Sequence, residues 1–95
     1  AGIPTNKIKD NKILTNPNPF SEYANIEFEL ENPSLIELYV YSIDGRKVKT
    51  LAGGNCPSGL NSFRWIPNSN QGCGSYIVVL KVNGKTYSQI IQYNR

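Results

Sequence analysis

Chemistry in this chain would have to come from carboxylates, cysteines, lysines, serines or tyrosines, because its 95 residues include no histidine. Histidine is the side chain that most often moves protons in enzymes. Glu27, Glu29 and Glu31 alternate with apolar residues, which places them on one face of a strand with no evident pocket, so we interpret them as a solvated face. Asp44 precedes a glycine, as is typical of a turn. We therefore predict no catalytic residues and no enzyme activity.

The motifs of common ligand sites are also missing from the sequence. Gly53 and Gly54 lack the following helix and Lys-Ser/Thr pair of a phosphate-binding loop. There is no Asp-rich calcium loop and no Ser–Lys nucleophile motif. The net charge of +3 is mild, and the basic–aromatic consensus of an RNA-binding sheet is absent. We predict no cofactor, no metal ion and no nucleic-acid partner.

Cys56 and Cys73 both lie in turn-like sequence, beside Pro57 and between two glycines respectively. Paired cysteines in a small domain that could be secreted favour a disulfide. Two free thiols are the alternative. A zinc site would need further ligands that the chain does not supply.

The elements that must position these residues are strands. Apolar residues alternate with polar ones, or form short runs, around residues 13–14 and over 26–31, 35–43, 46–51, 60–66, 75–82 and 85–93. Asp44-Gly45 and Asn83-Gly84 each predict a two-residue hairpin turn. We expect loops at 52–59 and 67–74, and a linker over residues 1–11 that precedes a domain at 12–95.

About seven short strands with regularly spaced turns predict an all-β, immunoglobulin-like antiparallel β-sandwich. Trp65 shares a strand face with Phe63, so we expect it to anchor the core between the two sheets. The 75–82 run is the most apolar, which is typical of a central strand. The free edges of such a sandwich could pair two copies of the chain.

The charges are unevenly distributed along the chain. All seven acidic residues precede Gly45, whereas seven of the ten basic residues follow it. One interpretation is that early acidic strands pair with late basic strands within the sheets. The other is a basic face that docks an anionic or acidic partner.

The order of several short segments resembles the type A C-terminal sorting domain of the type IX secretion system of Bacteroidetes, and related immunoglobulin-like modules of the flagellar-hook-cap kind. The resemblance covers roughly residues 13–95. The segments that carry it are Asn16–Phe20 (NPNPF), Leu38–Val48 (LYVYSIDGRKV), Gly59–Trp65 (GLNSFRW), Gly74–Leu80 (GSYIVVL) and Gly84–Tyr87 (GKTY).

This resemblance implies a recognition role at the end of a longer protein. Its partners would be an outer-membrane translocon, a sortase-like peptidase that removes the domain, and an upstream cargo domain. The protein would reach the outside or the cell surface through the periplasm. The residues that match the family's signal are Gly74, Tyr76, Gly84 and Lys85, with Arg95 as the basic end of the chain; Gln89 stands where the family usually has lysine.

Two other functions are compatible with the residues. An accessory or carbohydrate-binding module of a secreted hydrolase would stack sugar rings on exposed tyrosines such as Tyr23, Tyr39, Tyr41 or Tyr93. A structural spacer would need only the sandwich and its edges.

Overall fold

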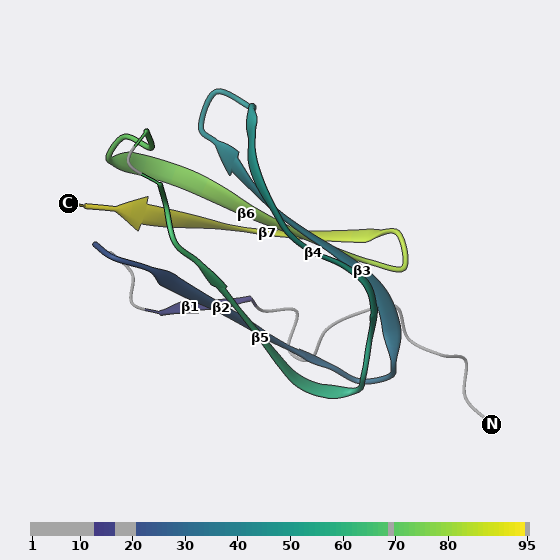
Figure 1. Cartoon of the computed structure of the whole chain (residues 1–95). Coiled ribbons are helices and arrows are strands. Elements are labelled where there is room, and N and C mark those ends of the chain that lie inside the picture. The colour runs from purple at the N-terminus through teal and green to yellow at the C-terminus, as the bar shows by residue number, and fades with distance from the viewer. Residues whose placement is uncertain (1–12, 17–20, 69, 95) are drawn as a thin grey trace.

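The computed structural model describes residues 13–16, 21–68 and 70–94, and these form two antiparallel sheets packed face to face (Figure 1). The expected linker at residues 1–11, Pro17, Pro19 and Arg95 lie outside the described residues. The strands are β1 (Leu14–Asn16), β2 (Ala24–Leu30), β3 (Ser34–Ser42), β4 (Lys47–Cys56), β5 (Gly59–Trp65), β6 (Gly74–Val82) and β7 (Lys85–Tyr93).

The strand order confirms the predicted sandwich. The three-stranded sheet has the order β1-β2-β5, and the four-stranded sheet has the order β4-β3-β6-β7. The chain crosses from one sheet to the other between β2 and β3, between β4 and β5, and between β5 and β6. This crossing pattern is that of an immunoglobulin-like fold. β6 lies between β3 and β7, so it is the central strand that its apolar sequence predicted.

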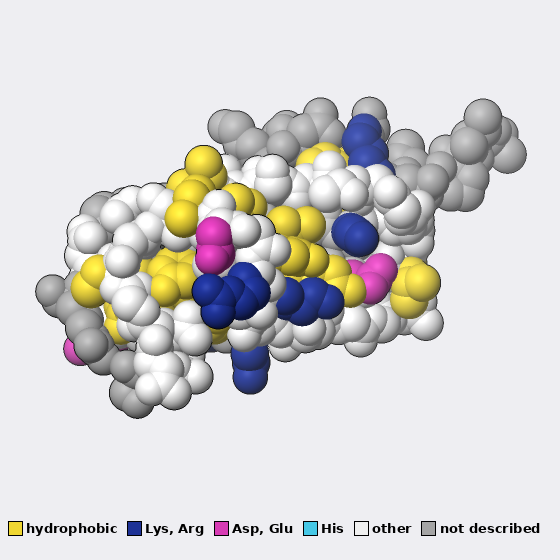
Figure 2. All heavy atoms as spheres, turned by 90° about the horizontal axis from the view of Figure 1, so that it is seen from above, with side chains coloured by type: hydrophobic (Ala, Val, Ile, Leu, Met, Phe, Trp, Pro, Cys, Tyr) yellow, Lys and Arg dark blue, Asp and Glu magenta, His cyan; other side chains and the backbone are white. Residues whose placement is uncertain are grey.

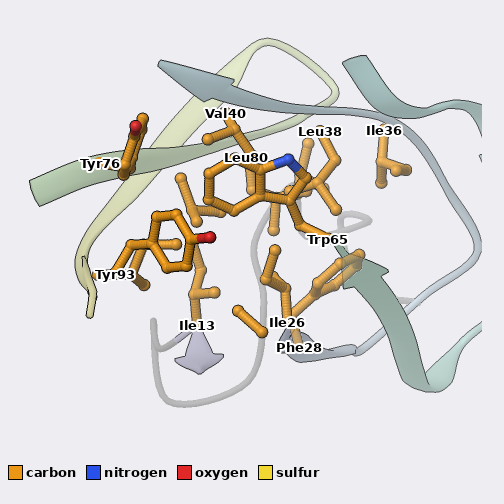
Figure 3. Packing of buried hydrophobic residues seen from close by; sticks show 14 of the residues in the cluster. Ile13, Ile26, Phe28, Ile36, Leu38, Val40, Trp65, Tyr76, Leu80 and Tyr93 are labelled. Atoms are coloured by element: carbon orange, nitrogen blue, oxygen red, sulfur yellow. The ribbon is translucent and has the colours of Figure 1, made fainter. Parts of the chain in front are cut away.

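The core lies between the sheets and is built from the alternate residues that the period of two predicts. Trp65 is 2% exposed and contacts residues of both sheets, which confirms its predicted role (Figure 3). The buried apolar residues are Ile13, Ala24, Ile26, Phe28, Leu30, Ile36, Leu38, Val40, Trp65, Tyr76, Val78, Leu80, Val82, Ile91 and Tyr93.

The expected loop at 52–59 is wrong, because β4 continues to Cys56 as a ten-residue edge strand. Gly53 and Gly54 pair with Glu37 and Ile36 of β3, so the glycines sit in a ladder instead of a loop. Glycine has low strand propensity, which is why the sequence pattern predicted a loop here instead of a strand. Two register shifts, beside Tyr39 and Tyr41 of β3, give β4 the bulges that are common at sheet edges.

The two hairpin turns differ from each other. Asn83 (φ 48°) and Gly84 (φ 94°) both have positive φ and join Val82 to Lys85, as predicted for a two-residue turn. Asp44 does not have positive φ, and only Gly45 does (φ 91°). The predicted two-residue turn is therefore wrong at this hairpin, where the Ser42 and Arg46 backbones close a three-residue loop.

Candidate functional site

Two of the segments that resemble a known family meet at one end of the sandwich. Gly74 begins β6 and pairs with Tyr93 at the end of β7. Two residues further on, Tyr76 pairs with Ser42 at the end of β3, where the hairpin to β4 begins. The β3–β4 hairpin, the start of β6 and the end of β7 therefore share this end of the four-stranded sheet, which is also where the chain ends (Figure 1).

A cleft of about 560 Å³ separates the β3–β4 hairpin from the loop before β6. The hairpin contributes Asp44, Arg46 and Lys47, and the loop contributes Gln71 and Cys73. Tyr76 lies at its base. Ile43 and Val48 of the hairpin also line the cleft, so its surface mixes charged and apolar groups.

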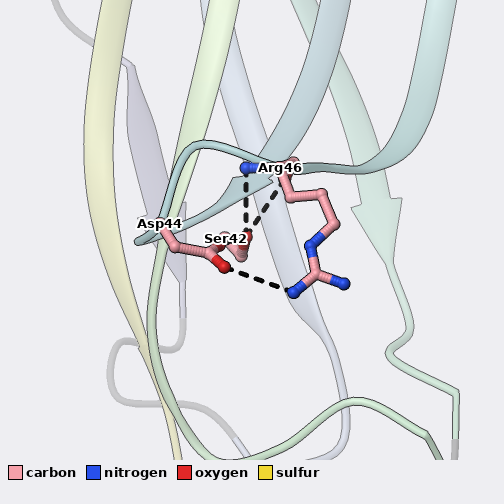
Figure 4. A network of polar contacts seen from close by, with 3 residues as sticks. All are labelled: Ser42, Asp44 and Arg46. Carbon is pink, nitrogen blue, oxygen red and sulfur yellow. Dashed lines mark hydrogen bonds and ion pairs between the residues drawn. The ribbon is translucent and has the colours of Figure 1, made fainter.

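Polar contacts within the hairpin fix the outer wall of the cleft (Figure 4). The Ser42 amide donates to the Arg46 carbonyl at 2.8 Å, and the Gly45 amide donates to the Ser42 carbonyl at 3.0 Å. The Ser42 hydroxyl donates to the Asp44 carboxylate, and Arg46 Nη2 lies 3.2 Å from Asp44 Oδ2. The Ser42 hydrogen bond and then Arg46 lower the pKa of Asp44. The Arg46 side chain is 82% exposed, so it can still meet a partner.

Tyr76 is buried at the base of the cleft, with 7% of its surface exposed (Figure 3). Its ring centre lies 5.1 Å from that of Trp65 and 6.4 Å from that of Tyr93. Its hydroxyl donates to the Gly72 carbonyl at 2.5 Å, which ties the preceding loop to the core. Burial, followed by the nearby Tyr93 and Cys73, raises the pKa of Tyr76. A partner therefore meets the cleft that Tyr76 supports and very little of its ring.

Gly84 and Lys85 lie at the opposite end of the same sheet. β6 rises about 3.3 Å per residue, so its eight steps from Gly74 to Val82 separate the two groups by roughly 26 Å. At the far end, the Asn83 amide donates to the Leu35 carbonyl at 2.9 Å, and Asn83 Oδ1 accepts from the Leu35 amide at 3.1 Å. Lys85 Nζ lies 5.6 Å from the centre of the Tyr87 ring. The structure thus places Gly74 and Tyr76 together and separates them from Gly84 and Lys85.

Comparison with known protein families finds a match over almost the whole of the described fold. Residues 15–93 match the model of the secretion system C-terminal sorting domain, which spans all but the first residue of the seven strands. The chain belongs to this family. The family comprises the sorting signals of the type IX secretion system, so the domain marks a secreted or cell-surface protein. No curated protein matches the chain.

The cysteines of the sorting domain do not form the expected bridge. Both thiols are free. Cys56 pairs with Ser34 at the start of β3. Cys73 directly precedes β6, whose first residues lie beside Ser42 at the other end of β3. β3 therefore separates the cysteines by roughly 26 Å, far beyond the ~7 Å Cα separation that a disulfide allows. Burial raises the pKa of the Cys56 thiol, while Cys73 is exposed.

The charges of the sorting domain segregate by sheet instead of pairing between strands. In the described register, Glu37 opposite Lys81 is the one acid–base pair across neighbouring strands. The four-stranded sheet and its turns carry Arg46, Lys47, Lys49, Lys81 and Lys85 against Glu37 and Asp44. The three-stranded sheet carries Glu27 and Glu29 against Arg64, with Glu22 and Glu31 near the ends of β2. The prediction of a basic face is the one that fits this arrangement.

Sequence reasoning missed a further surface, the outward side of the four-stranded sheet. Tyr39 and Tyr41 of β3 pair with Val79 and Ile77 of β6, and Ile77 pairs with Ile90 of β7. None of these five side chains is fully buried, and Ile90 is 59% exposed. The signal that could have found this surface is the 75–82 run, which is apolar at positions facing both ways.

The described residues hold no group of three or more His, Cys, Asp or Glu side chains placed to bind a metal ion. They also contain no helix that is long and apolar enough to cross a membrane.

Proposed function

We propose that residues 12–95 act as a non-catalytic tag that directs an upstream cargo protein from the periplasm through the outer-membrane translocon of the type IX system. A sortase-like peptidase then removes the tag and releases or anchors the cargo. The match to the sorting-domain family over residues 15–93 is the observation that carries this proposal.

The geometry supports a recognition role for the end of the sandwich that holds the cleft. The end of β7, the start of β6 and the exposed Arg46 lie together there. Gly74 and Tyr76 shape this end, and Arg95 follows it in sequence. In this proposal, the translocon reads the end that holds the cleft, and Gly84 and Lys85 form a second contact at the far end.

A reporter fusion tests the proposal. Residues 12–95 are fused to the C-terminus of a periplasmic reporter in a host with an active type IX system, and the exported fraction is measured. We expect export, and we expect none in the same host without its translocon. A reporter that stays in the periplasm of the competent host contradicts the proposal.

Point variants then test the proposed contacts without removing a strand. Deleting residues 85–95 would remove β7 from the core sheet, so its loss of export would not distinguish folding from recognition. Lys85→Ala and Arg46→Ala change exposed side chains and leave the core intact. We expect each to lower export of a folded fusion, whereas Arg64→Ala, at an exposed base of the three-stranded sheet, serves as the control.

Three of the four tyrosines proposed for the carbohydrate-binding alternative are covered by a cation or buried. Lys47 Nζ lies 4.1 Å above the centre of the Tyr39 ring, and the Arg64 guanidinium lies 4.2 Å above that of Tyr23. A sugar ring stacked on the same side of either ring would have to displace its cation. Tyr93 is 4% exposed, so its ring is closed to a ligand as well.

A further inference from the structure

The outward side of the four-stranded sheet carries neighbouring apolar side chains that the fold buries only in part, and Ile90 is 59% exposed. We call this surface, formed by Tyr39, Tyr41, Ile77, Val79 and Ile90, the outer face. Strand pairing makes it continuous across β3, β6 and β7. Figure 2 looks onto this sheet and shows hydrophobic side chains in several groups with Lys and Arg between them. An outward sheet face that meets only water is ordinarily polar, and strands that are apolar on both sides are ordinarily covered on both.

Tyrosines at the centre of the outer face are held in place by their neighbours. The rings of Tyr39 and Tyr41 meet edge to face with centres 6.2 Å apart. The Tyr39 hydroxyl donates to the Glu37 carboxylate, which raises the pKa of Tyr39, and Lys47 covers its ring. Ordered aromatic side chains lose little further freedom when a partner docks, so they suit the centre of a protein interface.

The charge around the outer face selects among partners. Lys47, Lys81 and Glu37 border it, so bases outnumber acids there as they do on the whole sheet. Two copies docked through this face would bring like charges together, which opposes a symmetric dimer. A protein surface that is apolar at its centre and acidic at its rim complements the face in both respects.

We infer that the outer face is the docking surface for a translocon protein with an apolar, acid-rimmed contact patch. This inference rests on the proposed function and adds a recognition surface that lies along the sheet, apart from the cleft at its end. The outer face would supply most of the area buried in the complex, and contacts at the two ends of the sheet would fix how the partner is aligned along it.

The reporter fusion tests the inference with two substitutions and one matched control. Ile90→Glu places a repelling charge at the most exposed residue of the face, on the edge strand β7, and Lys47→Glu reverses the charge at its border. Leu60→Glu is the control, since Leu60 is 66% exposed and lies on the outward side of the three-stranded sheet. Urea unfolding of the purified 95-residue chain first shows that every variant is folded.

We expect Ile90→Glu to lower the exported fraction about tenfold, because it puts a charge against the apolar patch of the partner, and Lys47→Glu about fivefold, because it reverses a rim charge. Lys47→Arg and Leu60→Glu should stay within about twofold of the original. If the unchanged fusion is exported and Ile90→Glu and Lys47→Glu are exported equally well, the inference is wrong and the proposed function stands. If the unchanged fusion stays in the periplasm, both fall. A concentration-dependent dimer that Ile90→Glu abolishes would show that a second copy occupies the face instead.

Discussion

Tyr76 offers the sharpest test of whether the Gly-x-Tyr segment is structural or is read directly by a partner. Tyr76→Phe removes one hydrogen bond, from its hydroxyl to the Gly72 carbonyl, and keeps the ring. A neutral hydrogen bond contributes about 0.5–1.5 kcal/mol to stability. Tyr76→Ala also removes a ring that is 7% exposed and touches Trp65 and Tyr93. Loss of a buried aromatic ring costs about 3–5 kcal/mol.

These two costs differ enough to be separated by equilibrium unfolding. Trp65 is the only tryptophan and is buried, so its fluorescence reports unfolding in urea, with circular dichroism as a second probe of the same transition. A domain of this size has about 5–15 kcal/mol of stability in total. We therefore expect Tyr76→Phe to remain folded with a melting temperature roughly 4–8 °C lower, and Tyr76→Ala to lose a large part of its stability.

Tyr41→Phe is the matched control, because Tyr41 lies on the outer face and its hydroxyl is not tied to the core. We expect this change to stay within about 0.5 kcal/mol of the original. If Tyr76→Phe costs as much as Tyr76→Ala, the assignment of the stability to ring burial is wrong. If Tyr76→Phe is stably folded and abolishes export, the hydroxyl is read by the translocon, and the structural role argued for Tyr76 fails.

Three further experiments test other parts of the fold. Gly84→Ala should destabilise the domain by about 1–2 kcal/mol in urea unfolding, because φ is 94° at this residue. Gly53→Ala should be near neutral, because Gly53 has an ordinary φ and open space around its Cα. Equal costs for the two substitutions would refute the turn assignment. Mild oxidation should leave both thiols open to maleimide labelling, Cys73 reacting before Cys56, and a bridged monomer by mass spectrometry would overturn the strand register. The pKa of Asp44 is lowered in the fold, so its ionised form adds stability that is complete above its ordinary pKa of about 3.9 and lost as pH falls through the folded value. Asp44→Asn should therefore unfold in urea with a weaker dependence on acid, and an unchanged dependence would show that the carboxylate contributes nothing.

Local pattern was enough to predict the strands, and it failed where backbone pairing overrides composition. Period-two alternation placed β2, β3, β6 and β7 nearly correctly because each has one face in the core. Gly53 and Gly54 have no side chains that could show a polar–apolar alternation, so only their pairing with β3 reveals that they belong to β4. The hairpin at Asp44 failed for a related reason, since Asp-Gly fits both a two-residue turn and a three-residue loop, and Ser42 decides between them.

The candidate site was harder to predict because its members are far apart in sequence and their separation in space depends on register. Gly74 and Lys85 are closer in sequence than Gly74 and Arg46, yet the cleft brings the second pair to one end of the sheet and the β6–β7 hairpin sends Lys85 to the other. The same dependence explains the cysteines, whose spacing in sequence allowed a bridge that the two directions of β3 and β6 forbid.

The burial of Tyr76 limits which residues of the folded domain a receptor can contact. A residue that packs against Trp65 and Tyr93 cannot be a contact for a folded-state receptor, so its place in the motif follows from holding the sheet end together. In the proposed function, recognition depends on what that packing leaves exposed, which is Arg46 beside the cleft, Lys85 at the far hairpin, and Ile90 between them on the outer face. These three positions lie along one sheet, and substitutions there should separate export from stability, whereas substitutions at Tyr76 or Trp65 should lower both together.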